Sequence, residues 1–161
     1  MDIEVIYLQY VNDLYRYIYS LCRNKSTTED LLQETFTKAH IVLLSKEVHE
    51  VKPWLFKVAR YTYIDLIRKE KRTHLTNKIE GMTNESPEKI IVEQDSFQTL
   101  LSLMENLSIY EKETILLCDV NDCSYEEAAS ILDLKLNTMK SHLRRGRNKM
   151  RKLLAKEDEN G

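Results

Sequence analysis

Apolar residues recur along this chain at steps of three and four, which is the spacing of an α-helix and not of a β-strand. The first helix is expected over residues 2–24, where the apolar positions are Ile3, Ile6, Tyr7, Tyr10, Leu14, Tyr17, Ile18 and Leu21. A second helix should begin at Thr27 or Thr28, because Thr27 and Asp30 have the form of a capping box. It carries Leu32, Phe36, Ala39 and Leu43 on one face. A third should run from Pro53, which suits a first helical turn, to about Arg72.

The pattern lapses between residues 73 and 96, where Thr, Asn, Ser and Glu, together with Gly81 and Pro87, replace periodic apolar positions. We interpret this stretch as an acidic linker between two small helical domains, residues 1–72 and 97–161. After the linker, helices are expected from Phe97 to Leu107 and from a Ser108 cap to Cys118. Glu111 completes a capping box with Ser108. The fold class is therefore all-α.

The last part of the chain has the pattern of a helix-turn-helix. Ser124-Tyr-Glu-Glu has the form of a capping box opening a helix that contains two adjacent alanines, Ala128 and Ala129. A longer helix then starts near Asn137 or Thr138. Its apolar seam consists of Leu136, Met139, Leu143, Gly146, Met150 and Leu153. The positions expected to face outward are Thr138, Ser141, Arg144, Arg145 and Asn148.

Composition supports a helical protein and narrows the class. The 161 residues are 42% hydrophobic and 31% charged, with only three glycines and two prolines, which argues against sandwiches and barrels rich in turns. Neither a signal peptide nor a run of about 18 to 20 apolar residues is visible. The three cysteines lack the spacing of a zinc site and are read as reduced thiols. A cytoplasmic protein without a metal or cofactor is expected.

Charge is segregated, although the net charge is only −2. Between Leu136 and Lys156 there are eight basic residues and no acid, and a second basic stretch spans residues 52–72. Two basic segments indicate two contacts with nucleic acid. A helix bearing Arg, Ser and Thr opposite its seam suits the major groove of duplex DNA. The pattern leaves open which of its residues touch bases and which touch phosphates.

The stretch 52–72 interleaves basic and aromatic residues, a composition that suits a melted strand. Leu55, Ala59, Thr62 and Leu66 are expected to pack inward. The basic face is predicted to hold Lys57, Arg60, Tyr61 and Arg68. Taken singly, Trp54, Phe56 and Tyr63 are better read as core aromatics. Tyr61 is the stronger candidate for stacking on an unpaired base.

Two strings in the C-terminal half resemble region 4 of extracytoplasmic-function sigma factors: Ser124-Tyr-Glu-Glu-Ala-Ala, and Thr138-Met-Lys-Ser-His-Leu-Arg-Arg-Gly-Arg. In that family this helix-turn-helix reads the minus-thirty-five promoter element. The resemblance implies that the residues binding the minus-thirty-five DNA are Thr138, Lys140, Ser141, Arg144, Arg145 and Arg147. The chain departs from the usual family pattern at Asn137, Met139, His142 and Gly146, where Gly, Val, Arg and Ala are common.

The N-terminal half resembles sigma region 2. Glu29-Asp-Leu-Leu-Gln-Glu-Thr-Phe36 is similar to the segment that docks on a coiled coil of the polymerase, which implies a docking ridge of Asp30, Gln33, Glu34 and Thr37. Pro53-Trp-Leu-Phe and Ile64-Asp-Leu-Ile-Arg-Lys resemble the part that binds and separates the minus-ten element. Its implied DNA-binding residues are Lys52, Trp54, Lys57, Arg60, Tyr61 and Arg68. Tyr61 departs from the family, where Asn is common.

The combined resemblance implies an alternative sigma factor, not an enzyme, that binds core RNA polymerase and promoter DNA and has no small-molecule substrate. It also implies a separate anti-sigma protein, often a membrane-bound one. A helix-turn-helix regulator acting without polymerase is the alternative, but it leaves the aromatic and basic stretch 52–72 unexplained. A nucleic-acid enzyme has little support, because no P-loop or convergent metal-binding set is present. The linker acids fit both a mimic of nucleic-acid charge and a solvated spacer.

Overall fold

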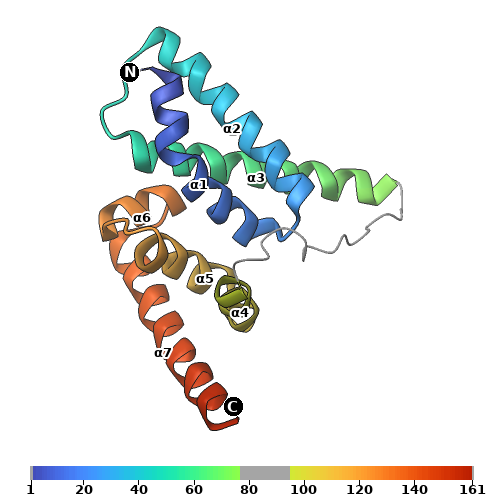
Figure 1. The fold of residues 1–161 in the computed structure, drawn as a ribbon, viewed down its shortest axis with the longest axis vertical. Coiled ribbons are helices and arrows are strands. Elements are labelled where there is room, and N and C mark those ends of the chain that lie inside the picture. The colour runs from blue at the N-terminus through green and yellow to red at the C-terminus, as the bar shows by residue number, and fades with distance from the viewer. Residues whose placement is uncertain (1, 77–94, 161) are drawn as a thin grey trace. The chain divides into compact units, whose positions relative to one another are not determined.

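The computed structural model describes residues 2–76 and 95–160, and every regular element within these ranges is a helix. The chain divides into two compact units, residues 1–90 and 91–161. Figure 1 shows the helices of each unit. The all-α class is confirmed. No helix in the described ranges is both long enough and apolar enough to cross a membrane.

The N-terminal unit consists of three helices, α1 (Ile3–Cys22), α2 (Lys25–Ser45) and α3 (Val51–Thr76). Each of the three contacts the other two along an apolar face. The aromatic rings of Tyr17 on α1 and Phe56 on α3 lie with their centroids 5.2 Å apart, and both side chains are fully buried. Tyr63 is half-buried and donates a 3.2 Å hydrogen bond from its hydroxyl to the carbonyl of Leu21. The core therefore fixes the direction of α3, whose opposite side faces solvent.

The cap of α2 lies earlier than expected. Arg23 adopts the left-handed conformation (φ 57°) and ends α1, and Asn24 is extended. The Asn24 side chain accepts a 2.8 Å hydrogen bond from the Thr27 backbone, so Asn24 is the cap and neither Thr27 nor Thr28 is. Thr28 is buried and donates its hydroxyl hydrogen bond back to the Asn24 carbonyl at 2.7 Å. The prediction was wrong because asparagine tolerates the extended cap position and satisfies the free N–H itself.

The C-terminal unit consists of α4 (Asp95–Met104), α5 (Ile109–Ile115) continued by the π-turn η2 (Leu116–Val120), α6 (Tyr125–Leu132) and α7 (Leu136–Asn160). Both predicted capping boxes are present. Ser108 and Glu111 exchange hydrogen bonds of 3.0 and 3.2 Å, and Ser124 and Glu127 exchange bonds of 2.9 and 3.0 Å. Asp133, at φ 59°, ends α6 and begins the tight turn into α7.

The predicted seam of α7 is the buried side of that helix. Met139, Leu143 and Met150 are at most 7% exposed, and Gly146 is buried. Gly146 permits a close crossing, because a Cβ added there would lie 3.0 Å from both the Glu111 carbonyl oxygen and Cδ1 of Ile115. The backbones of α5 and α7 therefore approach more closely than an alanine would comfortably allow.

Both helices that flank the predicted linker extend further toward it than expected. α3 continues to Thr76, and α4 already begins at Asp95. Residues 77–94 lie outside the described residues. This range includes Glu80, Glu85, Glu88 and Glu93, the acids on which the two interpretations of the linker depend. The structure therefore leaves both interpretations as predictions.

Candidate nucleic-acid interface

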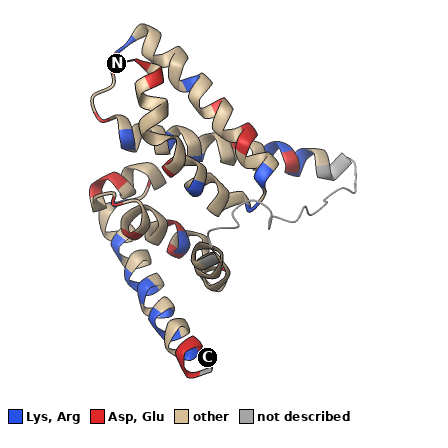
Figure 2. Cartoon of the chain, viewed as in Figure 1, with Lys and Arg blue, Asp and Glu red and all other residues tan. Residues whose placement is uncertain are grey.

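The first candidate surface is the solvent side of α7, where lysines and arginines follow one another along the helix (Figure 2). Thr138, Lys140 and Arg144 are exposed, and Ser141 is half-buried. The Arg144 side chain forms no hydrogen bond or ion pair with any other described residue. An arginine in this state keeps its guanidinium donors available for an external acceptor such as a guanine edge.

An open groove of about 530 Å³ runs along this side of α7 and reaches the start of α6. It is lined by Tyr125, Asn137, Lys140, Ser141, Leu143, Arg144, Arg147 and Arg151. The ammonium of Lys140 lies 5.7 Å from the centroid of the Tyr125 ring, within the range of a cation–π contact. The groove thus joins cationic side chains from α7 to an aromatic side chain from the helix that precedes it.

The two arginines at the flanks of this surface are tied to acids from other elements. Arg147 donates two hydrogen bonds, of 2.7 and 3.1 Å, to the carboxylate of Asp119 in η2, and this pairing raises the pKa of Arg147. Arg145 lies with Nε 3.7 Å from Glu111 and donates to Nδ1 of His142 at 3.1 Å. These contacts leave Lys140 and Arg144 as the less restrained of the predicted reading cations.

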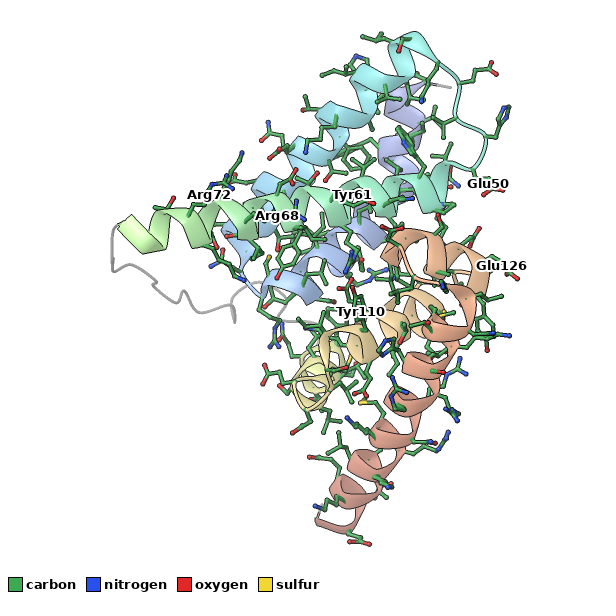
Figure 3. The ribbon with its side chains drawn as sticks, turned by 180° about the vertical axis from the view of Figure 1, so that it is seen from behind. Glu50, Tyr61, Arg68, Arg72, Tyr110 and Glu126 are labelled. Atoms are coloured by element: carbon green, nitrogen blue, oxygen red, sulfur yellow. The ribbon has the colours of Figure 1, made fainter. Side chains whose placement is uncertain are left out.

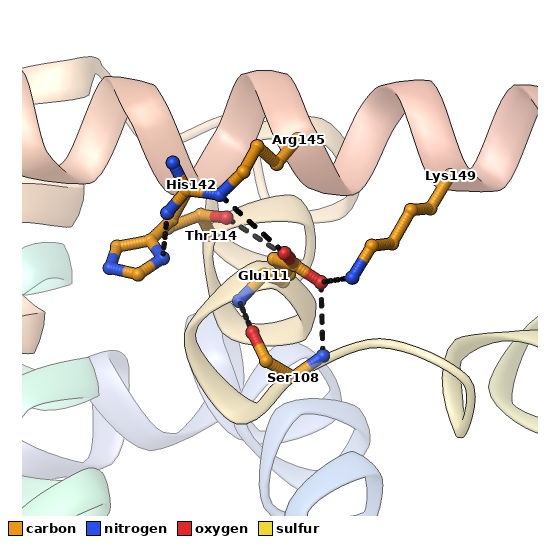
Figure 4. A network of polar contacts seen from close by, with 6 residues as sticks. All are labelled: Ser108, Glu111, Thr114, His142, Arg145 and Lys149. Carbon is orange, nitrogen blue, oxygen red and sulfur yellow. Dashed lines mark hydrogen bonds and ion pairs between the residues drawn. The ribbon is translucent and has the colours of Figure 1, made fainter.

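Glu111 is the centre of the polar network in Figure 4. Its side chain is only 6% exposed, and its carboxylate accepts hydrogen bonds from the Ser108 backbone at 3.0 Å and from Lys149 Nζ at 2.9 Å. The hydrogen bond from Lys149, followed by that from Ser108, lowers the pKa of Glu111 below its ordinary value. The sequence indicated Glu111 only as a capping residue, since its cationic partners belong to a distant helix.

The second candidate surface is the solvent side of α3. Tyr61 is 44% exposed, and Lys57 and Arg68 lie on the same side of the helix at helical spacing. Arg68 is exposed and lies 3.9 Å from Asp65, a loose ion pair. Figure 3 labels Tyr61 and Arg68 on α3, together with Arg72. An exposed ring between cations is the arrangement that holds an unpaired base against a charged backbone.

The structure corrects the predicted composition of this face. Consecutive residues of an α-helix point about 100° apart, so Arg60 cannot share the side occupied by Tyr61. Arg60 is only 8% exposed and turns toward the packed part of the unit. Lys52 is half-buried and also lies off this side by helical spacing. Arg72, which follows Arg68 by one turn and is exposed, belongs to the face but was not among the predicted site residues. Helical spacing counted from Tyr61 would have found it.

The third surface is the predicted docking ridge on α2. Asp30, Gln33, Glu34 and Thr37 are all exposed and together line one shallow groove. Glu34 pairs with Lys38 at 3.3 Å, and Lys38 in turn donates to the Thr62 hydroxyl of α3 at 3.1 Å. This contact ties the ridge to the helix that carries Tyr61.

An apolar groove of about 630 Å³ continues from the ridge toward the start of α1. Gln33 and Thr37 line both the ridge and this apolar groove. The groove also contains Tyr7 and Phe36, whose rings pack edge to face with their centroids 4.9 Å apart. An acidic ridge beside an apolar groove suits a helical partner with both apolar and basic side chains.

Comparison with known proteins gives two family matches in the order that the motifs indicated. The sigma-70 region 2 model matches residues 6–73, and the sigma-70 region 4 model matches residues 97–150. The chain is 34% identical to the ECF RNA polymerase sigma factor SigM of Bacillus subtilis (strain 168), over 95% of both chains. It is 29% identical to the RNA polymerase sigma factor YlaC of the same organism, over 98% of this chain and 95% of YlaC.

Solved structures show the same architecture. The sigma factor RpoE in complex with the anti-sigma factor NepR from Bartonella quintana aligns with a TM-score of 0.77 and 28% identity, covering 94% of this chain and 96% of RpoE. CnrH in complex with the cytosolic domain of CnrY aligns with a TM-score of 0.72 and 19% identity, over 95% of this chain and 87% of CnrH. The second match is a likeness of fold alone.

Proposed function

This chain belongs to the sigma-70 family of RNA polymerase sigma factors, in the extracytoplasmic-function group, and on that basis we propose how it acts at a promoter. It is an alternative sigma factor that binds core RNA polymerase and directs transcription initiation at specific promoters. The observation that carries the assignment is the presence of both family regions, in order, with SigM of Bacillus subtilis matched over 95% of each chain.

In the C-terminal unit, we assign minus-thirty-five reading to the solvent side of α7, with Thr138, Lys140, Ser141 and Arg144 toward the base edges. An α-helix fits the major groove, and arginine can donate two hydrogen bonds to one guanine. Arg144 supports this assignment best because its side chain is exposed and forms no hydrogen bond or ion pair with the other described residues. Arg145 and Arg147 remain in the proposed surface, but their acidic partners restrain them.

In the N-terminal unit, α3 is proposed to hold the melted minus-ten strand. Tyr61 offers an exposed ring for an unpaired base, while Lys57, Arg68 and Arg72 offer charge to the phosphates on either side. Trp54 is half-buried on the same side and extends this surface toward the start of α3. Arg60 and Lys52 are assigned no direct DNA contact.

The proposed division of labour follows the predicted boundaries. Residues 1–72 bind core polymerase and the minus-ten element, residues 97–161 read the minus-thirty-five element, and residues 73–96 link them. As a factor of this family the chain is proposed to have no enzymatic activity and to work in the cytoplasm, where its polymerase is. The anti-sigma partner of RpoE in the solved complex supports the proposal that this chain also has an anti-sigma partner.

A helix-turn-helix regulator acting without polymerase is not favoured. That function needs a duplex-binding unit, which α6 and α7 would supply. It gives no role to the match of residues 6–73 with sigma region 2 or to the exposed ring of Tyr61.

Neutralising the docking ridge tests polymerase binding. The Asp30→Asn, Glu34→Gln variant is expected to bind purified core polymerase about twofold to thirtyfold more weakly, because each exposed ion pair contributes about 0.2–1 kcal/mol. The measurement is a titration of labelled full-length chain with core polymerase at two salt concentrations.

Glu47→Gln with Glu50→Gln is the matched control, since it removes two exposed acids from the same unit outside the ridge. The ridge assignment requires the control to bind like the wild type. Equal affinities for the ridge variant and the wild type would refute the assignment and leave the apolar groove as the remaining contact.

A further inference from the structure

Glu111 is a buried acid placed against α7, the helix proposed to bind DNA. Its side chain is 6% exposed, whereas those of its cationic partners Arg145 and Lys149 are 49% and 51% exposed. The absence of a side chain at Gly146 brings the backbone of α5 close to α7 at this level. The carboxylate is therefore held between two residues on neighbouring turns of α7 (Figure 4).

The capping role of Glu111 does not require these cations. Glu127 forms the same capping box with Ser124, with hydrogen bonds of 2.9 and 3.0 Å, and no ion pair to Glu127 is found among the described residues. The box also tolerates glutamine, which can accept the same backbone hydrogen bond. The negative charge of Glu111 is thus an addition to its cap function.

Acids from α5 and η2 pair with some of the basic residues of α7 and not with others. Arg145 and Lys149 share the single carboxylate of Glu111, and Arg147 pairs with Asp119. Lys140 and Arg144, by contrast, form no ion pair with the described residues and line the groove beside Tyr125. Phosphate contacts made by lysine or arginine strengthen binding to every sequence alike, whereas base contacts distinguish sequences.

We infer that Glu111 is a positioning residue that sets the sequence specificity of this sigma factor, by holding Arg145 and Lys149 away from the DNA phosphates. Reading is thereby concentrated on the side of α7 that carries Lys140, Ser141 and Arg144. The inference rests on the proposed DNA-reading role of α7. Glu111, which lies outside the helix-turn-helix, would thus suppress binding that does not depend on the DNA sequence.

Glu111→Gln in the full-length chain tests the inference. Binding is measured to a labelled duplex selected by the wild type from a randomised pool, and to a scrambled duplex of the same composition, across a salt series. For the scrambled duplex, the slope of log affinity against log salt concentration should be steeper in the variant by about one to two. At ~0.15 M salt, the variant should bind this duplex about fivefold more tightly for each further phosphate that the released cations neutralise. The ratio of the two affinities should fall accordingly.

Glu127→Gln is the matched control, because it removes the same charge from the same kind of cap without contacting Arg145 or Lys149. Its salt slope and affinity ratio should match those of the wild type. A second test uses Lys149→Gln in both backgrounds. It should change the salt slope little in the wild type, where Lys149 is already paired, and lower it by about one in Glu111→Gln.

Two results would overturn the inference. One is an unchanged salt slope and affinity ratio in Glu111→Gln. The other is an equal weakening on both duplexes together with faster hydrogen exchange in α5 and α7, which would assign Glu111 a purely structural role. Failure of the proposed DNA-reading role is distinguishable, since the wild type itself would then select no sequence from the pool.

Discussion

Replacing Tyr61 and Arg68 together with alanine is expected to lower the fraction of open promoter complexes by about fivefold to a hundredfold. Stacking of one unpaired base on an aromatic ring contributes about 1–3 kcal/mol, which is comparable with the few kcal/mol needed to unstack a base. Tyr61 is the exposed ring on α3, and Arg68 lies on the same side of that helix. Their loss therefore shifts the balance between closed and open complexes.

Permanganate reactivity of promoter thymines measures this effect directly. The double variant should bind core polymerase and closed promoter DNA nearly as the wild type does, and a template with a pre-melted minus-ten bubble should restore much of its transcription. Lys69→Ala with Lys71→Ala is the matched control, because it removes two exposed cations from the same helix but off the Tyr61 side. A normal bubble in the Tyr61 and Arg68 variant would mean that other residues hold the strand.

Arg144→Ala is expected to weaken binding to a matched minus-thirty-five element by about 1–3 kcal/mol and to relax sequence preference at one position. The reason is that the Arg144 side chain is exposed and forms no hydrogen bond or ion pair with the described residues, so its guanidinium donors are available to a base, and alanine offers none in their place. Lys152→Ala, farther along α7, should instead weaken binding to all sequences alike and reduce the salt slope by about one.

A randomised minus-thirty-five library, bound by holoenzyme and sequenced, separates these two outcomes. The Arg144→Ala profile should lose information at one position, whereas the Lys152→Ala profile should keep the wild-type preference. An unchanged profile for Arg144→Ala would move base reading to the other residues of the groove, above all Lys140 and Ser141.

Features that depend on nearby residues could be predicted from the sequence. The two capping boxes at Ser108 and Ser124 and the buried seam of α7 are determined by side chains within a few turns of each other, and all three are present. The cap of α2 was placed wrongly because Asn24 competes with Thr27 and Thr28, and the left-handed conformation of Arg23 decides between them. Such backbone conformations are not visible in an apolar pattern.

The candidate site could be predicted only in part. Arg60 was placed beside Tyr61 because they are neighbours in sequence, although neighbours on a helix point in different directions. The restraint of Arg145 by Glu111 and of Arg147 by Asp119 depends on how α5 and η2 pack against α7. That packing depends on the small size of Gly146, which the sequence placed in the seam of α7 without indicating the close approach of α5.

The most direct test of the sigma-factor function is a reconstitution with purified core polymerase and genomic fragments from the source bacterium. Transcript starts and permanganate-reactive thymines are mapped with and without the chain. The chain is expected to create new starts, each preceded by a reactive bubble and a shared pair of sequence elements. If the chain binds DNA fragments but produces neither new starts nor a bubble with core polymerase, the sigma-factor function is contradicted and a regulator acting without polymerase takes its place.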